Sequence, residues 1–194
     1  MKICVYGSAS NLIDDEYKQR VYVLGKKLAE RGHTLIFGAG ANGLMGAAAR
    51  GWTDGKGEII GIVPHFFRDI KVEELYDKCT KVMWTDDMYQ RKALLESESD
   101  AYIITPGGIG TLDEFFAVLT NKQLGQHVKQ IAIYNVNGYY DRIKNLLDYA
   151  IKEKFVTPNC DKIYTVFGED ELDKMIEFIE TKPSGEKLDN LKDG

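Results

Sequence analysis

Short apolar runs alternate with longer amphipathic stretches along most of this chain, and this alternation limits its possible folds more than any other feature. The apolar runs predict strands at 2–7, 34–38, 58–63, 79–84, 101–105, 130–135 and 162–167. The stretches between them predict helices at 14–31, 43–54, 86–98, 111–125, 138–154 and 169–181, with a shorter piece at 66–76. Apolar strands without strict alternation, separated by helices, are typical of a parallel sheet buried on both faces.

The pattern therefore predicts an α/β fold, a doubly wound parallel sheet of about seven strands with right-handed crossovers and helices on both faces, as in Rossmann-like proteins. We expect residues 1–181 to form a single domain, because 194 residues suffice for one sizeable domain and are few for two. The stretch 182–194 is polar and aperiodic, which predicts a disordered tail. Ligands of such sheets bind outside the carboxyl ends of the strands.

Composition and charge exclude several classes of partner. The net charge of −5, with no block rich in Lys and Arg, argues against nucleic acid and membrane surfaces as partners. No apolar run approaches the ~20 residues of a membrane span. The three cysteines are far apart, as are the three histidines, so we expect no disulfide framework and no metal site. The chain opens directly into a strand with no signal-peptide core, which favours a cytoplasmic location.

The second predicted strand is followed by FGAGANGLMG, which has the G-x-G-x-x-G spacing of a dinucleotide fingerprint at Gly38, Gly40 and Gly43. That fingerprint belongs after the first strand, with an acid near the end of the second strand to hold a ribose. Here the acid at a suitable distance, Glu58, begins a strand instead. An NAD site is therefore disfavoured, and the glycines serve either the approach of another nucleotide or close helix–strand packing.

A small polar turn, Gly7-Ser8-Ala9-Ser10, ends the first predicted strand. It is either a loop that happens to contain serines or a set of hydroxyl and backbone donors for a nucleotide. Both interpretations place Gly7 and Ser8 at the carboxyl edge of the sheet.

The fifth predicted strand ends in the loop PGGIGT (106–111), which opens a helix. Such a loop exposes N–H groups and the positive end of a helix dipole, which suits a phosphate, yet two acids follow within the expected first turn. A purely structural interpretation is a capping box, with Thr111 as N-cap and Glu114 at N3. Three glycines within four residues exceed what a cap needs, and they favour N–H groups that converge on an anion, from Gly107, Gly108 and Gly110.

The helix after the fourth predicted strand carries a charged residue on an apolar stripe. Met88, Arg91 and Leu95 fall at i, i+3 and i+7, so Arg91 shares a face with two apolar side chains. Arg91 is either an ion-paired or extended arginine at the margin of that face or a cation at the mouth of a site near the fifth-strand loop. Lys92 lies one position round and is expected to face solvent.

Two of these stretches resemble the signatures of one family. PGGIGTLDE (106–114) is similar to the PGGxGTxxE signature of the Lonely Guy family, the cytokinin riboside 5′-monophosphate phosphoribohydrolases, and MYQRK (88–92) resembles its MxxRK signature. GAGANGLMG is similar to that family's GGGxxGLMG turn, and QLGQHVKQIAIYNVNGYYD to the segment after the glycine-loop helix. The resemblance covers about residues 2–167. Ala39, Tyr89 and Ala9 depart from the family pattern, and the departures at Ala39 and Ala9 leave the base preference open.

The resemblance implies hydrolysis of the N-glycosidic bond of an adenine nucleotide, AMP or an N6-prenylated relative, to free base and ribose 5-phosphate. It implies Arg91 and Glu114 as catalytic residues and the glycine loop, with Thr111, as the phosphate site. Met88 and Lys92, from the second signature, are expected to bind substrate. It also implies a homodimer. No cofactor is required, and no lysine has a context for a pyridoxal phosphate aldimine, although the family is often labelled lysine decarboxylase.

Breaking the C1′–N bond builds positive charge on the ribose, as in glycoside cleavage. One nucleotide then presents a dianionic phosphate at one end and a transient cation at the other, which explains a carboxylate near an anion site. Glu114 can stabilise the cation and orient or deprotonate water, whereas Asp113 is expected to face solvent or serve the helix dipole. Arg91 could hold the phosphate, position Glu114 or assist the departing base.

Two other functions use the same sequence features. A non-catalytic nucleotide or molybdenum-cofactor carrier would use the same fold and phosphate loop, but it would not need both Glu114 and Arg91. An NAD-dependent oxidoreductase would need a true fingerprint after the first strand.

Overall fold

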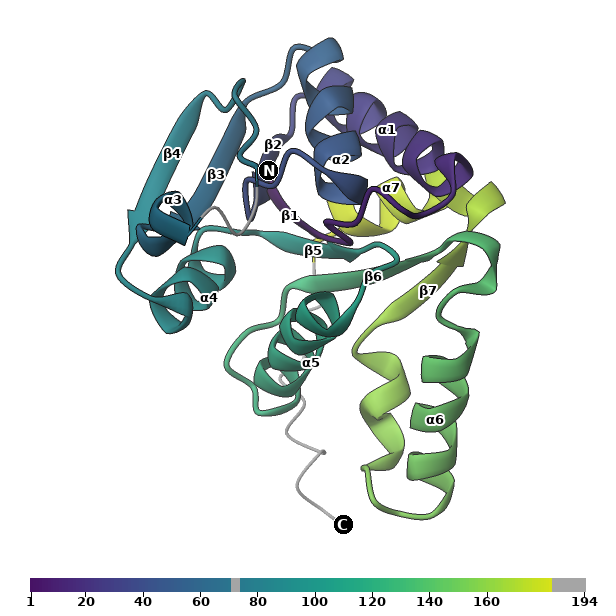
Figure 1. Ribbon diagram of the computed structural model, residues 1–194. Helices are drawn as coiled ribbons and strands as arrows, with labels where there is room; N and C mark the ends of the chain where they lie inside the picture. Colours follow the sequence, from purple (N-terminus) through teal and green to yellow (C-terminus); the bar gives the residue numbers. More distant parts are fainter. Residues whose placement is uncertain (71–73, 183–194) are drawn as a thin grey trace.

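The computed structural model describes residues 1–70 and 74–182, and it contains one seven-stranded sheet in which neighbouring strands are parallel (Figure 1). The strands are β1 Lys2–Tyr6, β2 Thr34–Phe37, β3 Ile59–Pro64, β4 Lys81–Thr85, β5 Ala101–Ile104, β6 Gln130–Asn135 and β7 Thr165–Gly168. The helices are α1 Asp15–Glu30, α2 Gly43–Asp54, α3 Phe66–Ile70, α4 Met88–Ser97, α5 Ile109–Gln123, α6 Asp141–Lys152 and α7 Leu172–Glu180, with 3₁₀ turns η1 Val136–Gly138, η2 Pro158–Lys162 and η3 Glu169–Glu171. The predicted fold class is confirmed.

The strand order is β4-β3-β2-β1-β5-β6-β7, so the sheet grows first to one side of β1 and then to the other. β1 and β5 are neighbours in space although about a hundred residues separate them, with Tyr6 opposite Ile104. The loops that leave β1 and β5 therefore diverge to opposite faces of the sheet. In doubly wound sheets this switch point forms the crevice that holds ligands.

Helices cover both faces of the sheet (Figure 1). One hydrophobic core packs α1, α2 and α7 against the sheet, with Trp52 among its fully buried side chains. The other packs α4, α5 and α6, with Phe115 and Tyr102 at its centre. Since β1 contributes Ile3 and Val5 to the first core and Cys4 and Tyr6 to the second, both of its faces are buried, as its apolar run predicts.

Two predicted strands begin at least two residues later than expected. β4 starts at residue 81 rather than 79, because Thr80 bonds to Ile59 through its side-chain oxygen as well as its backbone N–H. Residues 162–164 precede β7, since Pro158 opens the 3₁₀ turn η2 that extends to Lys162. The short predicted helix at 66–76 is confirmed only at 66–70. Residues 71–73, and residues 183–194 of the tail predicted at 182–194, lie outside the described residues. Within the described ranges, no helix combines the length and apolarity that crossing a bilayer requires.

Candidate active site

The loops that follow β1 and β5 lie against each other at the switch point. The Ser8 N–H donates to the Pro106 carbonyl at 3.0 Å, and the Thr105 hydroxyl donates to the Tyr6 carbonyl at 2.8 Å. Gly7 permits this approach, because a Cβ there would lie 2.2 Å from Thr105 Oγ1. Gly7 thus has a packing role, and the substrate contacts expected of Gly7 and Ser8 stay predictions.

The glycine loop at 106–111 opens α5 without a side-chain cap. Gly108 is the N-cap residue and has an extended backbone, so the helix begins at Ile109. No acid lies in its first turn. A Cβ added to Gly108 or Gly110 would meet no heavy atom of the described residues within 4 Å, so this side of the helix start is open. Uncapped N–H groups at the positive end of a helix dipole favour an anion.

The capping-box interpretation of 111–114 is wrong. Thr111 is the third helical residue rather than the N-cap, and it is buried beneath Gly107, whose added Cβ would lie 2.2 Å from Thr111 Oγ1. Glu114 is the sixth helical residue and lies beyond the first turn, as does Asp113. The helix starts two residues earlier than predicted because Gly108 adopts the extended conformation that an N-cap position requires. The negative charges are therefore further from the helix start than the sequence indicates.

The start of α2 differs from that of α5, because its N–H groups are bonded within the protein. Gly43 donates to Asn11 Oδ1 at 3.0 Å, and Leu44 donates to the Ser8 carbonyl at 2.7 Å. Gly40 forms an antiparallel bridge with Leu75. Of the two glycine loops, the one at α5 therefore has the open helix start, and substrate contacts of Gly40 and Gly43 stay predictions.

Glu58 lies at the amino end of β3, opposite the glycine loops, where its side chain accepts a hydrogen bond from Thr34. Its carboxylate cannot reach a ribose at the carboxyl edge of the sheet. The structure therefore agrees with the sequence that the dinucleotide fingerprint lacks the acidic residue that would bind the ribose.

Arg91 points inward from α4, as its place on the apolar stripe predicts. It is 6% exposed, and its guanidinium donates to the carbonyls of Ile62 and Gly38, each at 3.2 Å. A third contact joins its Nη1 to Met88 Sδ at 3.7 Å. These bonds fix one cation beneath the carboxyl ends of β2 and β3. A Cβ on Gly38 would collide with the Arg91 guanidinium, so the position requires glycine for steric reasons.

Glu114 is half-buried on α5. Burial raises the pKa of the Cys4 thiol; the charge of Glu114 raises it further, and that of Arg91 lowers it. Burial also raises the pKa of the Tyr6 phenol, to which the nearby Cys4 and Glu114 add. Glu114 and Arg91 are therefore near enough to these buried groups of β1 to place two opposite charges around the end of one strand.

Lys92 is half-buried rather than fully exposed. Its ammonium forms an ion pair with Asp113 at 3.0 Å, which links α4 to α5. Asp113 itself is exposed, as expected. The pair places one positive and one negative group beside the glycine loop without adding net charge.

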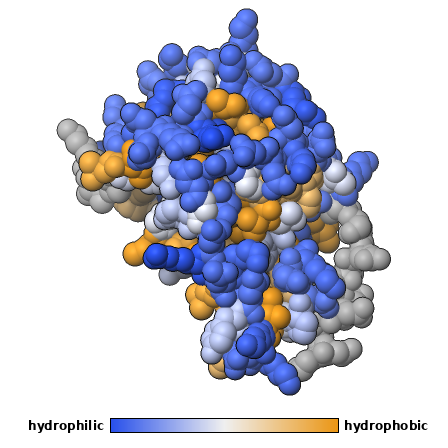
Figure 2. All heavy atoms as spheres, turned by 90° about the vertical axis from the view of Figure 1, so that its right-hand side faces the viewer, coloured by the Kyte–Doolittle hydropathy of each residue, from blue (hydrophilic) through white to orange (hydrophobic). Residues whose placement is uncertain are grey.

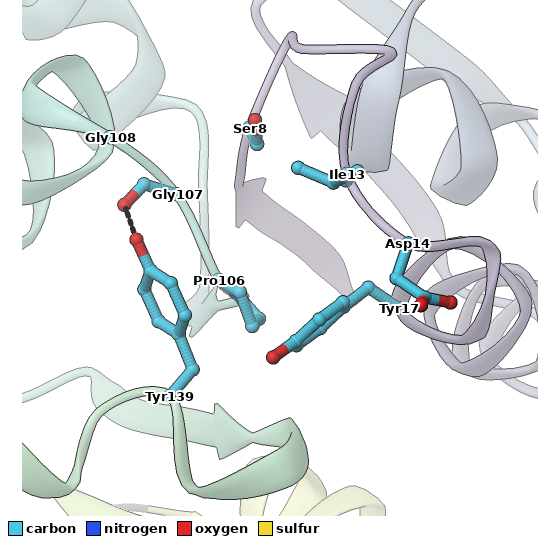
Figure 3. Close-up of a pocket in the computed structure, with 8 residues that line it drawn as sticks. All are labelled: Ser8, Ile13, Asp14, Tyr17, Pro106, Gly107, Gly108 and Tyr139. Atoms are coloured by element: carbon cyan, nitrogen blue, oxygen red, sulfur yellow. Dashed lines mark hydrogen bonds between the residues drawn. The ribbon is translucent and has the colours of Figure 1, made fainter.

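A cavity of about 310 Å³ lies between the loops after β1 and β5 (Figure 3). Its lining brings together three predicted site residues, Ser8, Gly107 and Gly108, with Ile13, Asp14, Tyr17, Pro106 and Tyr139. Figure 3 shows Tyr17 reaching from the start of α1 towards Pro106 and Tyr139. Neither tyrosine lies in a predicted site motif, although the position of NVNGYYD, directly after a strand that ends at this edge, could have indicated Tyr139.

An α/β sheet with an uncapped helix start beside a cavity at its switch point is the arrangement found in proteins that bind nucleotides and other phosphate-containing ligands. Residues 45–177 match a family model described as "Possible lysine decarboxylase". The chain is 34% identical over 180 residues to "Probable cytokinin riboside 5′-monophosphate phosphoribohydrolase LOGL3" of Oryza sativa subsp. japonica, covering 92% of this chain and 84% of the relative. It is 37% identical over 163 residues to "Cytokinin riboside 5′-monophosphate phosphoribohydrolase LOG3" of Arabidopsis thaliana, covering 84% and 74%. The chain belongs to this LOG family.

Solved structures extend the likeness at the level of fold. The molybdenum cofactor carrier protein from Chlamydomonas reinhardtii matches with a TM-score of 0.69, 18% identity and coverage of 93% of this chain and 98% of that chain. The molybdenum cofactor binding protein of Rippkaea orientalis matches with a TM-score of 0.64 at 21% identity, covering 93% and 96%. At these identities the likeness shows the shared fold alone.

Proposed function

We propose that this protein hydrolyses the N-glycosidic bond of adenine-type nucleoside 5′-monophosphates, AMP or N6-prenylated AMP, to free base and ribose 5-phosphate. Membership of the LOG family supports the phosphoribohydrolase reaction. The observation that carries the proposal is the start of α5, where uncapped N–H groups precede the carboxylate of Glu114 on the same helix.

The spacing along α5 suits the two ends of one nucleotide. Glu114 lies five residues beyond Ile109, about 8 Å along the helix axis. A phosphate on the first N–H groups therefore leaves the ribose within reach of the carboxylate. Glu114 stabilises the developing oxocarbenium charge and orients or deprotonates the attacking water, and the base leaves with its bonding electron pair and a proton.

Of the three roles open to Arg91, which are to hold the phosphate, to position Glu114 or to assist the departing base, its contacts best fit a positioning role. Two backbone carbonyls and Met88 hold its guanidinium, and it is almost fully buried. Its positive charge and the negative charge of Glu114 act in opposite directions on the pKa of the buried Cys4 thiol of β1. No step of this mechanism needs a metal or an organic cofactor.

The protein is also proposed to be a cytoplasmic homodimer. Tyr89, Ile109 and Phe116 expose apolar surface on α4 and α5 beside the site, with 82% and 88% exposure at Tyr89 and Ile109. By contrast, the face seen in Figure 2 is mostly hydrophilic, with apolar side chains in separate groups. A second copy of the chain would cover the α4–α5 surface. The free thiols of Cys4, Cys79 and Cys160 suit a reducing compartment.

Incubation with AMP, followed by chromatographic detection of adenine and ribose 5-phosphate, tests the reaction. We expect equal amounts of both products. A carrier of the same fold would bind the nucleotide and return it intact. If AMP is recovered unchanged after prolonged incubation with a large amount of protein, this result would contradict the hydrolase and favour the carrier.

A further inference from the structure

Two consecutive tyrosines from the connection between β6 and α6 hold the loop that follows β5. The Tyr140 hydroxyl donates to the Thr105 carbonyl at 2.8 Å, and the Tyr139 hydroxyl donates to the Gly107 carbonyl at 2.7 Å. The carbonyl between them, that of Pro106, accepts the Ser8 N–H at 3.0 Å. Three successive carbonyls ahead of α5 are thus bonded within the protein.

The backbone of η1 allows neighbouring tyrosines to reach the same loop. Asn137 and Gly138 both have positive φ, 52° and 67°, which reverses the chain sharply after β6. The Tyr140 N–H then donates to Asn135 Oδ1 at 2.7 Å, which fixes the turn. Tyr139 packs edge-to-face on Tyr17 at 6.4 Å, so its ring has a fixed place although it is half-exposed.

Fixing a carbonyl also fixes the next N–H, because a trans peptide unit is planar and its C=O and N–H point in opposite directions. The bond from Tyr139 to the Gly107 carbonyl therefore turns the Gly108 N–H away from Tyr139. In the same way, the bond from the Ser8 N–H to the Pro106 carbonyl turns the Gly107 N–H away from Ser8. Neither glycine has a Cβ to restrict rotation of the unit between them. Without the Tyr139 hydroxyl, this peptide unit is free to rotate and present its carbonyl oxygen to an anion.

We infer that Tyr139 is a positioning residue of the phosphate loop, which holds the Gly107 carbonyl away from the 5′-phosphate and orients the Gly108 N–H towards it. The inference rests on the proposed function, since it takes the start of α5 as the phosphate site. Tyr139 contacts the loop rather than the reacting bond, so its effect belongs to binding of the phosphate and not to cleavage.

Tyr139→Phe removes the hydroxyl and keeps the ring, and Tyr22→Phe is the matched control. The Tyr22 hydroxyl forms a bond of the same length, 2.7 Å to Asp54, between α1 and α2 and outside the site. Calorimetric titration with inorganic phosphate measures the affinity of the loop for phosphate in the absence of any reaction. Steady-state kinetics with AMP then give KM and kcat separately. Melting temperatures show that both variants fold.

In Tyr139→Phe we expect the Kd for phosphate and the KM for AMP to rise roughly fivefold, the size of one ordinary hydrogen bond, with kcat changed less than twofold. Tyr22→Phe should match the parent protein in all three. Unchanged phosphate affinity in Tyr139→Phe, or an equal loss in Tyr22→Phe, overturns the inference, as does a fall confined to kcat.

The same experiment separates this inference from the proposed function. If the parent protein releases adenine from AMP but Tyr139→Phe binds phosphate normally, the hydrolase stands and the role of Tyr139 fails. If the parent protein releases no adenine but Tyr139→Phe loses phosphate affinity, the role of Tyr139 stands and the hydrolase fails. A parent protein that binds neither phosphate nor AMP overturns both.

Discussion

Glu114 is a residue whose charge can be removed without touching the start of α5. Glu114 is the sixth residue of the helix, beyond the N-cap Gly108 and the first turn. We therefore expect Glu114→Gln to fold normally while hydrolysis of AMP slows ~10²- to 10⁴-fold, the range of a positioned acid–base or electrostatic group. AMP affinity should hold or improve slightly, since a like charge near the phosphate is lost.

The neighbouring carboxylate provides the control for this change. Asp113 is exposed and paired with Lys92, so Asp113→Asn should alter turnover by less than about threefold, as removal of a surface ion pair does. Single-turnover assays of both variants measure the difference. Near-normal turnover in a folded Glu114→Gln protein would leave the reaction without its principal residue.

Gly43 is the first residue of α2 and Gly108 is the N-cap of α5, and the two glycines differ in what surrounds them. Gly43 has φ +57°, and a Cβ there would lie 2.3 Å from the Ser8 carbonyl oxygen, whereas a Cβ on Gly108 meets nothing within 4 Å among the described residues. Gly43→Ala should therefore cost at least about 2 kcal/mol of stability, from left-handed backbone strain and collision. Gly108→Ala should keep the stability and weaken AMP binding instead. Equal denaturation midpoints for the two variants would contradict this assignment.

His127 should make the protein sensitive to mild acid. Burial lowers the pKa of His127 to about 4, and its Nδ1 accepts the Lys129 N–H, which requires the neutral ring. The unfolded chain takes up this proton near the ordinary value of 6.5, so between pH 6.5 and 4 the unfolded state binds more protons and the free energy of unfolding falls as pH falls. The loss attributable to this residue is about 2 kcal/mol. Urea titrations at pH 7 and pH 4.5 should show a smaller loss of unfolding free energy in His127→Gln than in the parent protein. An identical loss in the two proteins would refute the role of His127.

If the glycine loop and the start of α5 hold the 5′-phosphate as proposed, we expect the phosphate to contribute to catalysis. The open helix start supplies fixed donors, and energy from binding a remote group can be used to place the reacting bond. Adenosine should therefore have a kcat/KM roughly 10²-fold or more below that of AMP, equivalent to about 3 kcal/mol. Parallel assays of the nucleoside and the nucleotide measure the ratio. Comparable values for the two substrates would mean that α5 does not hold the phosphate.

The whole molecule should exist as a dimer in solution. The apolar side chains of Tyr89, Ile109 and Phe116 lie on α4 and α5, the helices that also carry Arg91 and Glu114. A monomer leaves this surface in water, which is unfavourable by roughly 25 cal/mol for each Å². Light scattering at micromolar concentration should give about twice the 21.9 kDa mass of the chain. A monomeric mass under these conditions would contradict the dimer, and Tyr89→Glu should shift the equilibrium towards it.

The order of strands and helices and the doubly wound class could be predicted from the sequence, because short continuous apolar runs and amphipathic stretches with a period of 3.6 residues are local properties. So could the inward direction of Arg91, which follows from its spacing to Met88 and Leu95, and the glycine loops at the ends of β1, β2 and β5. The failures concern boundaries: α5 starts before Thr111 because the extended backbone of Gly108 makes it the N-cap, a choice that the TLDE pattern concealed.

Tertiary structure alone decided which glycine loop is open and what surrounds it. The N–H groups of α2 are occupied by Asn11 and by the Ser8 carbonyl, partners more than thirty residues away in sequence. Lys122 is a buried cation on α5 whose pKa falls to about 8 through burial, and no local pattern indicates this. The bonds of Tyr139 and Tyr140 to the β5 loop depend on β6 lying beside β5. A sequence determines what each segment can form, but which hydrogen-bonding groups remain available depends on the segments that folding brings against it.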